Sequence, residues 1–439
     1  MTGFRSFFVA FVFFLPAFAA NCAEDLQEKD QVLSYIDRHF EEQISFLEKV
    51  VNINSGTRNI SGVRKVGEEF AAEFEKLGFK NFWIKMPFEM KRAGHLYSQR
   101  EGEDGPHILL IGHLDTVFSK DSDFQKFTHQ GNHITGPGVV DMKGGDVVML
   151  YALKALHACG ILDGKSIKIF LTGDEENVGP PLSLSRRELI DAAKQSDMAL
   201  SFESGQQDQA VIARRGASLW SLGVSAKRAH SSTIFSEDSG DGAIYETARI
   251  LKKFHKFAQN MPNLTLNPAV IAGGTSAGFD AGSATWTSAG KDNIIPQVVE
   301  SRGDLRFISR EQLDDARAEM RKIIEENLPH TSAEITFTDL YPAMSITPEN
   351  KRLLGVLDEV SQELGYGPVG PNQPGDRGAG DISFVAPHVA SIDALGPWGG
   401  GSHTTQEWLD TEGFRKATKR TALLLYQIFQ SHQRHPDGS

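Results

Sequence analysis

The chain has 439 residues, of which 40% are hydrophobic and 42 are glycines, a composition typical of a globular protein long enough for two domains. Its 45 basic and 57 acidic residues give a net charge of −12, and no cluster of lysines or arginines offsets it. These values argue against a nucleic-acid-binding surface, and the two cysteines, Cys22 and Cys159, are too few for a disulfide framework.

Residues 1–23 have the pattern of a secretory signal peptide. A basic residue precedes an apolar run over 7–15, and the alanines that follow offer an A-x-A cleavage site. The run is too short to span a bilayer well. We therefore expect cleavage after Ala19 or near Ala23, a periplasmic or secreted mature protein and no stable membrane insertion. Lipoprotein anchoring at Cys22 is disfavoured because the preceding residues, FAAN, fit a lipobox poorly.

Four apolar segments further along the chain share one design. Each has the pattern of a β-strand and ends in His, Asp or Glu within a loop that contains glycine: HILLIGHLDTV (107–117), SIKIFLTGDEE (166–176), DMALSFESG (197–205) and HVASIDALGPWGGGSH (388–403). Helical patterns, such as that over 142–158, lie between them, so the sequence predicts a mainly parallel α/β sheet. Because sites in such sheets form beyond the carboxyl ends of the strands, we expect these polar residues to converge.

Residues 214–330 have a different pattern. The strand ASLWSLGVSA is followed by a helix over 242–259, the strands LTLNPAVIA and VVESRGDLRFIS, a helix over about 310–328 and the strand AEITFTD. This β-α-β-β-α-β order predicts a ferredoxin-like domain inserted into the larger one. We expect the larger domain to comprise residues 24–213 and 331–439.

Five residues in these loops are candidate metal ligands or their supports. His113 and Asp115 in GHLDTVF lie two apart on an extended strand end, so Asp115 is placed to orient the imidazole while its other nitrogen meets a metal. Asp141 in GPGVVDMKGG precedes a helix, which it either caps or leaves free to be shared between cations. Glu203 in FESG and His403 in GGGSHTT again follow apolar runs. Histidines and carboxylates without thiolate suit zinc, cobalt or manganese.

Three adjacent carboxylates, Asp174, Glu175 and Glu176, end one of the strands. Such crowding costs free energy unless the groups are solvated or face a cation. Adjacent residues of an extended segment point apart, so the two glutamates can have different tasks. We expect Asp174 to occupy a solvated turn.

The combination H-x-D…D-x-K-G…E-E…E…H resembles the two-zinc carboxypeptidases and aminoacylases, which include bacterial glutamate carboxypeptidase, acetylornithine deacetylase and succinyl-diaminopimelate desuccinylase. The resemblance runs over roughly residues 40–430, with all five blocks in family order. It implies a zinc-hydrolase fold in which the main domain is catalytic and the inserted domain serves as a lid or for dimerisation. It also implies two Zn²⁺ ions, with Co²⁺ or Mn²⁺ as substitutes, and a homodimer formed through the inserted domain.

The resemblance assigns one role to each position of the metal site. Asp141 is implied to bridge both metals. His113 and Glu203 are implied to complete the ligands of one metal, and Glu176 and His403 those of the other.

The resemblance also implies three residues that assist the reaction. Glu175 is implied as the general base, and Asp115 as the residue that orients His113. In family dimers a histidine of the inserted domain reaches the active site of the partner subunit and binds the oxyanion, and His230 in GVSAKRAHSS matches that position.

Four further residues are candidates for substrate binding. Asn293 and Arg306 in NIIPQVVESRGDLR match family positions near the lid. Glutamate carboxypeptidase has an arginine for the substrate carboxylate before a Pro-Ala pair, but here TDLYPAM places Tyr341 there, which cannot form a bidentate charged pair. The lysine that glutamate carboxypeptidase uses for a glutamate side chain is also absent. We expect Arg377 in the Gly-rich GDRGAGDIS loop to compensate.

The sequence therefore predicts a hydrolase of an amide bond next to an amino acid, with a small peptide or N-acyl amino acid as substrate. A carboxypeptidase or dipeptidase is favoured, since biosynthetic deacylases usually lack an export signal. An N-acyl-amino-acid deacylase is the alternative. A metal-free ligand-binding protein is disfavoured because all five ligands are present.

Overall fold

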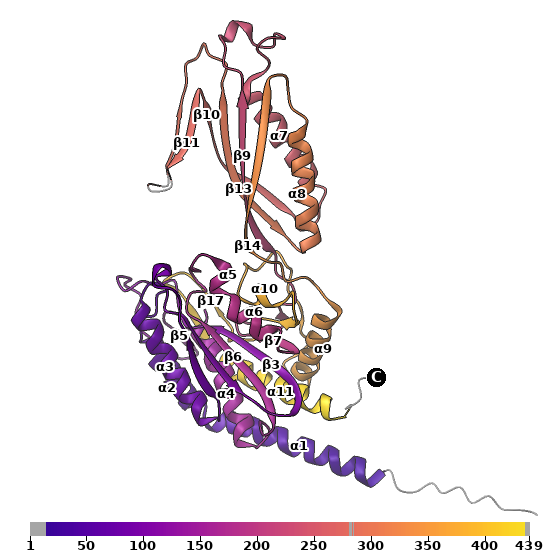
Figure 1. Ribbon diagram of the computed structural model, residues 1–439. Helices are drawn as coiled ribbons and strands as arrows, with labels where there is room; N and C mark the ends of the chain where they lie inside the picture. The colour runs from indigo at the N-terminus through magenta and orange to yellow at the C-terminus, as the bar shows by residue number, and fades with distance from the viewer. Residues whose placement is uncertain (1–14, 281–282, 284, 435–439) are drawn as a thin grey trace, which may run out of the picture.

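The computed structural model describes residues 15–434 apart from 281, 282 and 284, and it has two domains (Figure 1). The main domain is built on a six-stranded sheet in the order β1-β2-β6-β3-β7-β16. These strands are β1 (Lys80–Ile84), β2 (His95–Arg100), β3 (Asp104–His113), β6 (Lys165–Thr172), β7 (Met198–Ser201) and β16 (Ala390–Ile392). β6, β3, β7 and β16 are parallel, whereas β2 and β1 are antiparallel additions at one edge. The four parallel strands are those predicted from sequence, so the mainly parallel α/β sheet is confirmed.

Apolar side chains on both sides of the central strand β3 require cover on both faces of this sheet. Ile108 and Leu110 pack into one core, and Leu109 and Ile111 pack into another on the opposite face. The first face is covered by α1 (Leu15–Arg38), α2 (Phe40–Val51), α3 (Ile60–Lys76), α4 (Lys143–Ala158) and α11 (Thr411–Arg434). The second is covered by α6 (Arg187–Ala193) and α10 (Ile382–Val385), while α9 (Pro348–Glu363) packs beside β16. A continuous apolar run is the pattern expected of a parallel strand buried on both faces.

The inserted domain has an antiparallel sheet in the order β10-β13-β9-β14. Its elements are β9 (Gly216–Ala226), α7 (Gly242–Ala258), β10 (Thr265–Gly274), β13 (Val298–Phe307), α8 (Arg310–Glu325) and β14 (Thr331–Tyr341). The two helices cover one face, on which Trp220, Leu222 and Val224 are buried. This is the expected ferredoxin-like βαββαβ arrangement (Figure 1).

One hairpin of the inserted domain was not expected from the sequence. It comprises β11 (Ser276–Asp280) and β12 (Thr285–Ala289), which pair with each other. The guanidinium of Arg302 on β13 lies 4.5 Å from the ring centroid of Phe279 and 5.1 Å from that of Trp286. These cation–π contacts hold the hairpin against the sheet.

The expected boundary between the domains at residue 330 is wrong by one strand. β14 pairs along its length with β9, from Thr331 opposite Ala226 to Tyr341 opposite Ala217, so it belongs to the inserted sheet. The main domain resumes only after Tyr341. The β-α-β-β-α-β order includes this strand in the inserted domain, and its pairing with β9 places the boundary after it.

Shorter elements complete the main domain. One small sheet has the order β17-β18-β5-β4, and β8 pairs with β15. Their bounds are β4 (Thr128–Gln130), β5 (His133–Thr135), β8 (Gln209–Ala210), β15 (Gly370–Pro371), β17 (Gly399–Gly400) and β18 (Trp408–Asp410), and the helix α5 covers Leu182–Ser185.

The N-terminal helix α1 begins at Leu15 and runs through both expected cleavage positions. Residues 1–14, which hold most of the expected signal peptide, lie outside the described residues. Over the part of the chain that the structure describes, no helix combines the length and the apolar character needed to cross a membrane.

Candidate metal centre

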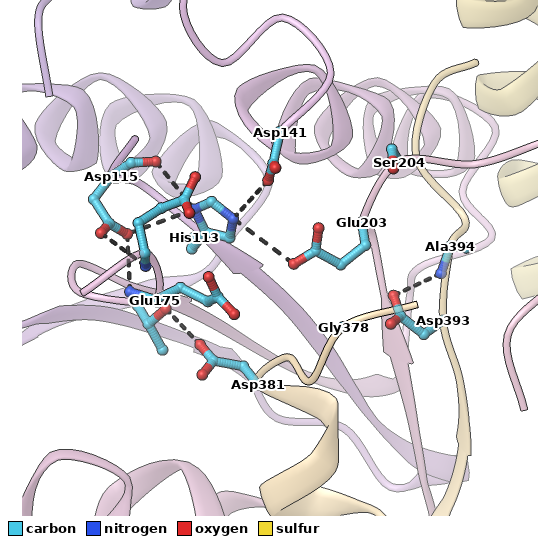
Figure 2. A network of polar contacts seen from close by, with 12 residues as sticks. His113, Asp115, Asp141, Glu175, Glu203, Ser204, Gly378, Asp381, Asp393 and Ala394 are labelled. Carbon is cyan, nitrogen blue, oxygen red and sulfur yellow. Dashed lines mark hydrogen bonds and ion pairs between the residues drawn. The ribbon is translucent and has the colours of Figure 1, made fainter. Parts of the chain in front are cut away.

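Five candidate ligands come from five different loops and meet beyond the carboxyl ends of the parallel strands. His113 ends β3, Glu176 follows β6, Glu203 follows β7, Asp141 lies just before α4, and His403 follows β16. Parallel strands direct the loops that follow them to one edge of the sheet, and the predicted convergence is therefore observed. Figure 2 shows His113 with Asp141 and Glu203 directed toward its ring.

Asp141 stands between two pairs of ligands. Its Oδ1 lies 3.2 Å from Nε2 of His113, which is also 3.7 Å from Oε1 of Glu203. Its Oδ2 lies 3.2 Å from Nε2 of His403, which is also 3.0 Å from Oε2 of Glu176. The two oxygens of one carboxylate thus face two separate groups of donors.

These separations fit metal coordination. Two ligand atoms bound tetrahedrally at about 2.0–2.1 Å from one zinc ion lie roughly 3.3 Å apart. Ligand atoms of His113, Asp141 and Glu176 all lie within 4.8 Å of one another. The donor set of two imidazoles and three carboxylates, with Asp141 in the middle, therefore fits two cations that share one ligand.

The electrostatics of this cluster also favour bound cations. Burial raises the pKa of Glu203 to about 8, and the nearby Asp141 adds to the shift. Hydrogen bonds to Asp141 and Glu176 raise the pKa of His403 to about 11. Neighbouring carboxylates contribute to both shifts, because carboxylates held together in a buried site favour positive charge among them. Bound divalent cations would supply that charge and displace the protons.

Asp115 contacts His113 in a different way from the one expected. The imidazole Nδ1 lies 3.0 Å from the backbone carbonyl oxygen of Asp115 and 3.5 Å from its carboxylate. The carboxylate instead accepts hydrogen bonds from the backbone N–H groups of Glu175 (3.0 Å) and Glu176 (3.2 Å) and from the hydroxyl of Thr57 (2.6 Å). Asp115 therefore orients the ring with its backbone carbonyl and its carboxylate, and the same carboxylate anchors the acidic loop.

The expectation that Asp174 occupies a solvated turn is wrong. Its side chain is fully buried, and its carboxylate accepts hydrogen bonds from Arg186 Nη1 (2.5 Å), the Ser185 hydroxyl (2.9 Å) and the Gly179 N–H (2.9 Å). Arg186 also donates from Nε to Asp381 at 2.7 Å. A buried arginine between two carboxylates therefore supports the loop that carries the two glutamates.

Glu407 supports the metal centre but was not identified from the sequence. Its buried carboxylate accepts hydrogen bonds from the N–H groups of Gly138 (3.1 Å), Val140 (2.9 Å) and Asp141 (3.1 Å). Burial raises its pKa to about 7 against the lowering effect of these bonds. The only sequence signal was an acidic residue four positions after His403, between polar residues and a strand.

We expect Glu407→Gln to weaken metal binding by about 10–100-fold, the range typical of outer partners that orient a ligand. The amide would offer one acceptor where the carboxylate serves three donors, so the Asp141 loop would lose its anchor. Metal titration of the apoprotein measures the effect. Glu412→Gln, an exposed glutamate at the start of α11, is the control and should leave affinity unchanged.

The lysine of the D-x-K-G motif has a structural position. The Lys143 side chain is buried, and its Nζ donates hydrogen bonds to the carbonyl oxygens of Val50 (3.0 Å) and Ile53 (2.9 Å). Burial lowers its pKa to about 7. Lys143 thus ties the start of α4, next to Asp141, to the end of α2.

The structure separates the predicted residues of the inserted domain. His230 and Asn293 lie together at the end of its sheet away from the main domain, where His230 pairs with Ile294 and the Ser231 N–H donates to the carbonyl oxygen of Asn293. Arg306 and Tyr341 lie at the other end, because both are opposite Ala217 of β9. Within one chain these four residues do not form a single pocket.

Two arginines lie near the Glu203 side of the centre. Arg377, a predicted residue, donates hydrogen bonds to the hydroxyl (3.0 Å) and the carbonyl oxygen of Ser204, the neighbour of Glu203. Arg214, which the sequence did not single out, is buried and donates to Asp393 at 2.8 Å and to the carbonyl oxygen of Gly378 at 2.6 Å. Because Arg214 begins the inserted domain, it joins that domain to the loop that carries Arg377.

Comparison with known proteins agrees with this geometry. The model of peptidase family M20/M25/M40 matches residues 109–427. Carboxypeptidase G2 from Pseudomonas sp. (strain RS-16) is 26% identical over 426 residues, covering 94% of this chain and 95% of the relative. Succinyl-diaminopimelate desuccinylase from Methylorubrum populi is 27% identical over 391 residues, covering 81% and 92%. Aminopeptidase PepT from Bacillus cereus has a similar fold, with a TM-score of 0.68 at 16% identity over 89% of this chain and 98% of its own.

The two-domain α/β fold and its cluster of histidines and carboxylates define a metal-dependent hydrolase. The chain belongs to peptidase family M20/M25/M40, since the family model covers more than half of it. The family resemblance indicated by the sequence motifs is thereby confirmed.

Proposed function

We propose that this protein hydrolyses a peptide bond adjacent to an amino acid, as a carboxypeptidase or dipeptidase does, and that it uses two zinc ions. The observation that carries the proposal is the position of Asp141, whose two oxygens face the His113–Glu203 and His403–Glu176 pairs. When bound, the two cations would supply an activated water and polarise the scissile carbonyl.

The surroundings of Glu175 support its assignment as the general base. Glu175 forms no ion pair among the described residues, and its backbone N–H is held by Asp115. Figure 2 shows its side chain next to His113, on the side of the cluster where Glu203 lies. In the proposed reaction Glu175 accepts the proton of the attacking water and then passes it to the leaving amine.

His230 supplies the remaining hydrogen-bond donor for the oxyanion, and it does so from a second subunit. Between Gly216 and Ala226, β9 spans about 33 Å at ~3.3 Å per residue, and His230 lies beyond its distal end. The His230 imidazole is exposed, and its Nδ1 contacts Ser232 at 2.8 Å. A histidine so far from the metal centre of its own chain reaches such a centre only in a partner, which supports the proposed homodimer.

Mixing two inactive variants tests this arrangement. His230→Ala and Glu175→Gln homodimers should each be nearly inactive, whereas an equal mixture, after subunit exchange, should regain about a quarter of wild-type activity. The reason is that half of the dimers are mixed and each has one site with both residues intact. Absence of recovery in exchanged dimers, verified by differential tagging, would contradict the shared site.

An N-acyl-amino-acid deacylase is the second candidate, and the similarity to succinyl-diaminopimelate desuccinylase favours it. Tyr341 packs against Phe384 with ring centroids 5.0 Å apart and cannot hold a substrate carboxylate by a charged bidentate pair, but peptides and N-acyl amino acids both carry that carboxylate, so Tyr341 does not separate the two activities. A panel of dipeptides and matched N-acyl amino acids, assayed with the zinc-loaded protein, separates the two activities. The metal content of the same preparation is also measured. If the protein holds no metal and stays inactive after zinc or cobalt is added, both hydrolase activities are excluded, and a metal-free ligand-binding protein is the remaining candidate.

The proposed compartment is the periplasm or the exterior, as the pattern of residues 1–23 indicates. Mass spectrometry of the N-terminus of the expressed protein, after cell fractionation, tests this proposal. A mature chain that begins near residue 20 or 24 supports export, and an intact N-terminus in the cytoplasmic fraction contradicts it.

A further inference from the structure

A pocket of about 490 Å³ lies beside the metal centre on the side of Glu176. Three segments line it: residues 56–59 before α3, residues 116–121 after β3, and the Glu176–Asn177 pair after β6. A metal ligand is thus part of the pocket wall. The volume is within the range that holds a small molecule or one end of a larger one.

The wall of this pocket is fixed to the same framework as the ligands. Arg92 donates from Nε to the carbonyl oxygen of Asn177 at 2.6 Å and from Nη2 to its side-chain oxygen at 2.7 Å. On the facing segment, the Thr57 hydroxyl donates to Asp115, which also holds the backbone of Glu175 and Glu176. The backbone and side-chain groups that line the pocket are therefore held in fixed positions relative to the metal centre.

Two cations of the pocket wall form no ion pair among the described residues. Arg58 and Lys120 line the pocket with exposed side chains, and neither forms an ion pair within the described part of the chain. The lining carboxylates are Asp121, which also has no ion pair among described residues, and Glu176, which faces His403 and the metal centre. Burial and, after it, the nearby Arg58 lower the pKa of Arg92, which places a third cation close by.

This pocket and Arg377 adjoin different ligands of the metal centre, because the pocket wall includes Glu176 and Arg377 binds Ser204, the neighbour of Glu203. Figure 2 shows Asp115, whose carboxylate holds Thr57, and Ser204, which accepts from Arg377, on opposite sides of His113. A substrate whose scissile amide lies at the metals and whose amino-acid carboxylate lies toward Arg377 therefore extends its acyl portion toward Arg58 and Lys120.

We propose that Arg58 and Lys120 form a subsite for an anionic group on the acyl portion of the substrate. The inference rests on the proposed hydrolase function and specifies its substrate class: peptides or N-acyl amino acids with a carboxylate at each end. Two exposed cations beside a metal-bound amide favour such substrates over neutral ones of the same shape.

The test uses pairs of substrates that differ only in this charge. Glutamyl-alanine is compared with glutaminyl-alanine, and N-succinyl-alanine with N-succinamoyl-alanine, so that both candidate reactions are covered. We expect the wild-type kcat/KM to favour the anionic member by about tenfold or more, and the double variant R58Q/K120Q to remove the preference. Activity on the neutral member should remain, and the preference should fall as ionic strength rises.

Lys65→Gln is the matched control, because Lys65 is an exposed cation on α3 outside the pocket lining. It should keep the wild-type preference. An equal preference in the wild type and in R58Q/K120Q, or no preference in the wild type, would overturn the subsite while leaving hydrolysis intact.

A binding measurement separates the subsite from the proposed reaction. If no substrate is hydrolysed, the binding of the same substrate pairs to zinc-loaded Glu175→Gln is measured by calorimetry. Tighter binding of the anionic member, lost when Arg58 and Lys120 are also replaced, would support the subsite and refute only the hydrolysis. Equal binding of the anionic and the neutral member would refute the subsite as well as the hydrolysis.

Discussion

Replacing Glu175 with glutamine is expected to lower kcat by about 10²–10⁴-fold while leaving the metal content unchanged. The glutamine has nearly the same shape but cannot accept the proton of the attacking water. Glu175 makes no ion pair with the ligand histidines, whereas its neighbour Glu176 lies 3.0 Å from His403. The two measurements are turnover with a substrate from the panel and metal analysis after gel filtration.

The matched control for this prediction is Glu176→Gln, one residue away in the same loop. That variant should lose metal as well as activity, because it removes a charged ligand next to Asp141. Substantial turnover by Glu175→Gln would exclude Glu175 as the base. Loss of metal from Glu175→Gln would instead make it a ligand.

Replacing Arg186 with leucine is expected to lower the free energy of unfolding by about 3–5 kcal/mol. Arg186 is fully buried between Asp174 and Asp381, so its removal leaves two buried carboxylates without a cation. Equilibrium denaturation of the metal-loaded protein measures the loss. Activity should fall as well, since the same network holds the loop of Glu175 and Glu176.

Two further variants make this prediction specific. Arg187→Leu changes the adjacent, largely exposed arginine, whose one ion pair among the described residues is with Glu188, and should cost less than about 1 kcal/mol. The triple variant R186L/D174N/D381N should recover part of the stability because no uncompensated charge stays buried. If Arg186→Leu alone lowered the free energy of unfolding by less than about 1 kcal/mol, the ion pairs of Arg186 would not stabilise the loop of Glu175 and Glu176.

Much of the fold and of the metal centre was predictable because the signals are local. The four parallel strands appear as apolar runs, and each is followed within a few residues by a polar loop, so the placement of His113, Glu176 and Glu203 follows from sheet geometry alone. His403 was predicted in the same way, although a longer loop separates it from β16. Asp141 was predicted from its Gly-rich loop before a helix. The ferredoxin-like order of the inserted domain was also evident from the alternation of strands and helices.

Other features depended on residues far apart in the chain, which no local pattern reports. The polarity of Asp174 predicted exposure, but its partner Arg186 and the second carboxylate, Asp381, are 12 and 207 positions away. β14 was visible as a strand, but its sheet is decided by pairing with β9, more than 100 positions earlier.

By itself the sequence determined the kinds of element, their order and the donor atoms of the proposed two-metal site, because periodicity and residue chemistry are properties of short segments. Only the tertiary structure decided which charges are neutralised and which are left over. It pairs Asp174 with a buried arginine, anchors the Asp141 loop on Glu407 and leaves Arg58 and Lys120 without ion-pair partners among the described residues. Charge neutralisation depends on distance in space, and distance in space is fixed only when the chain is folded.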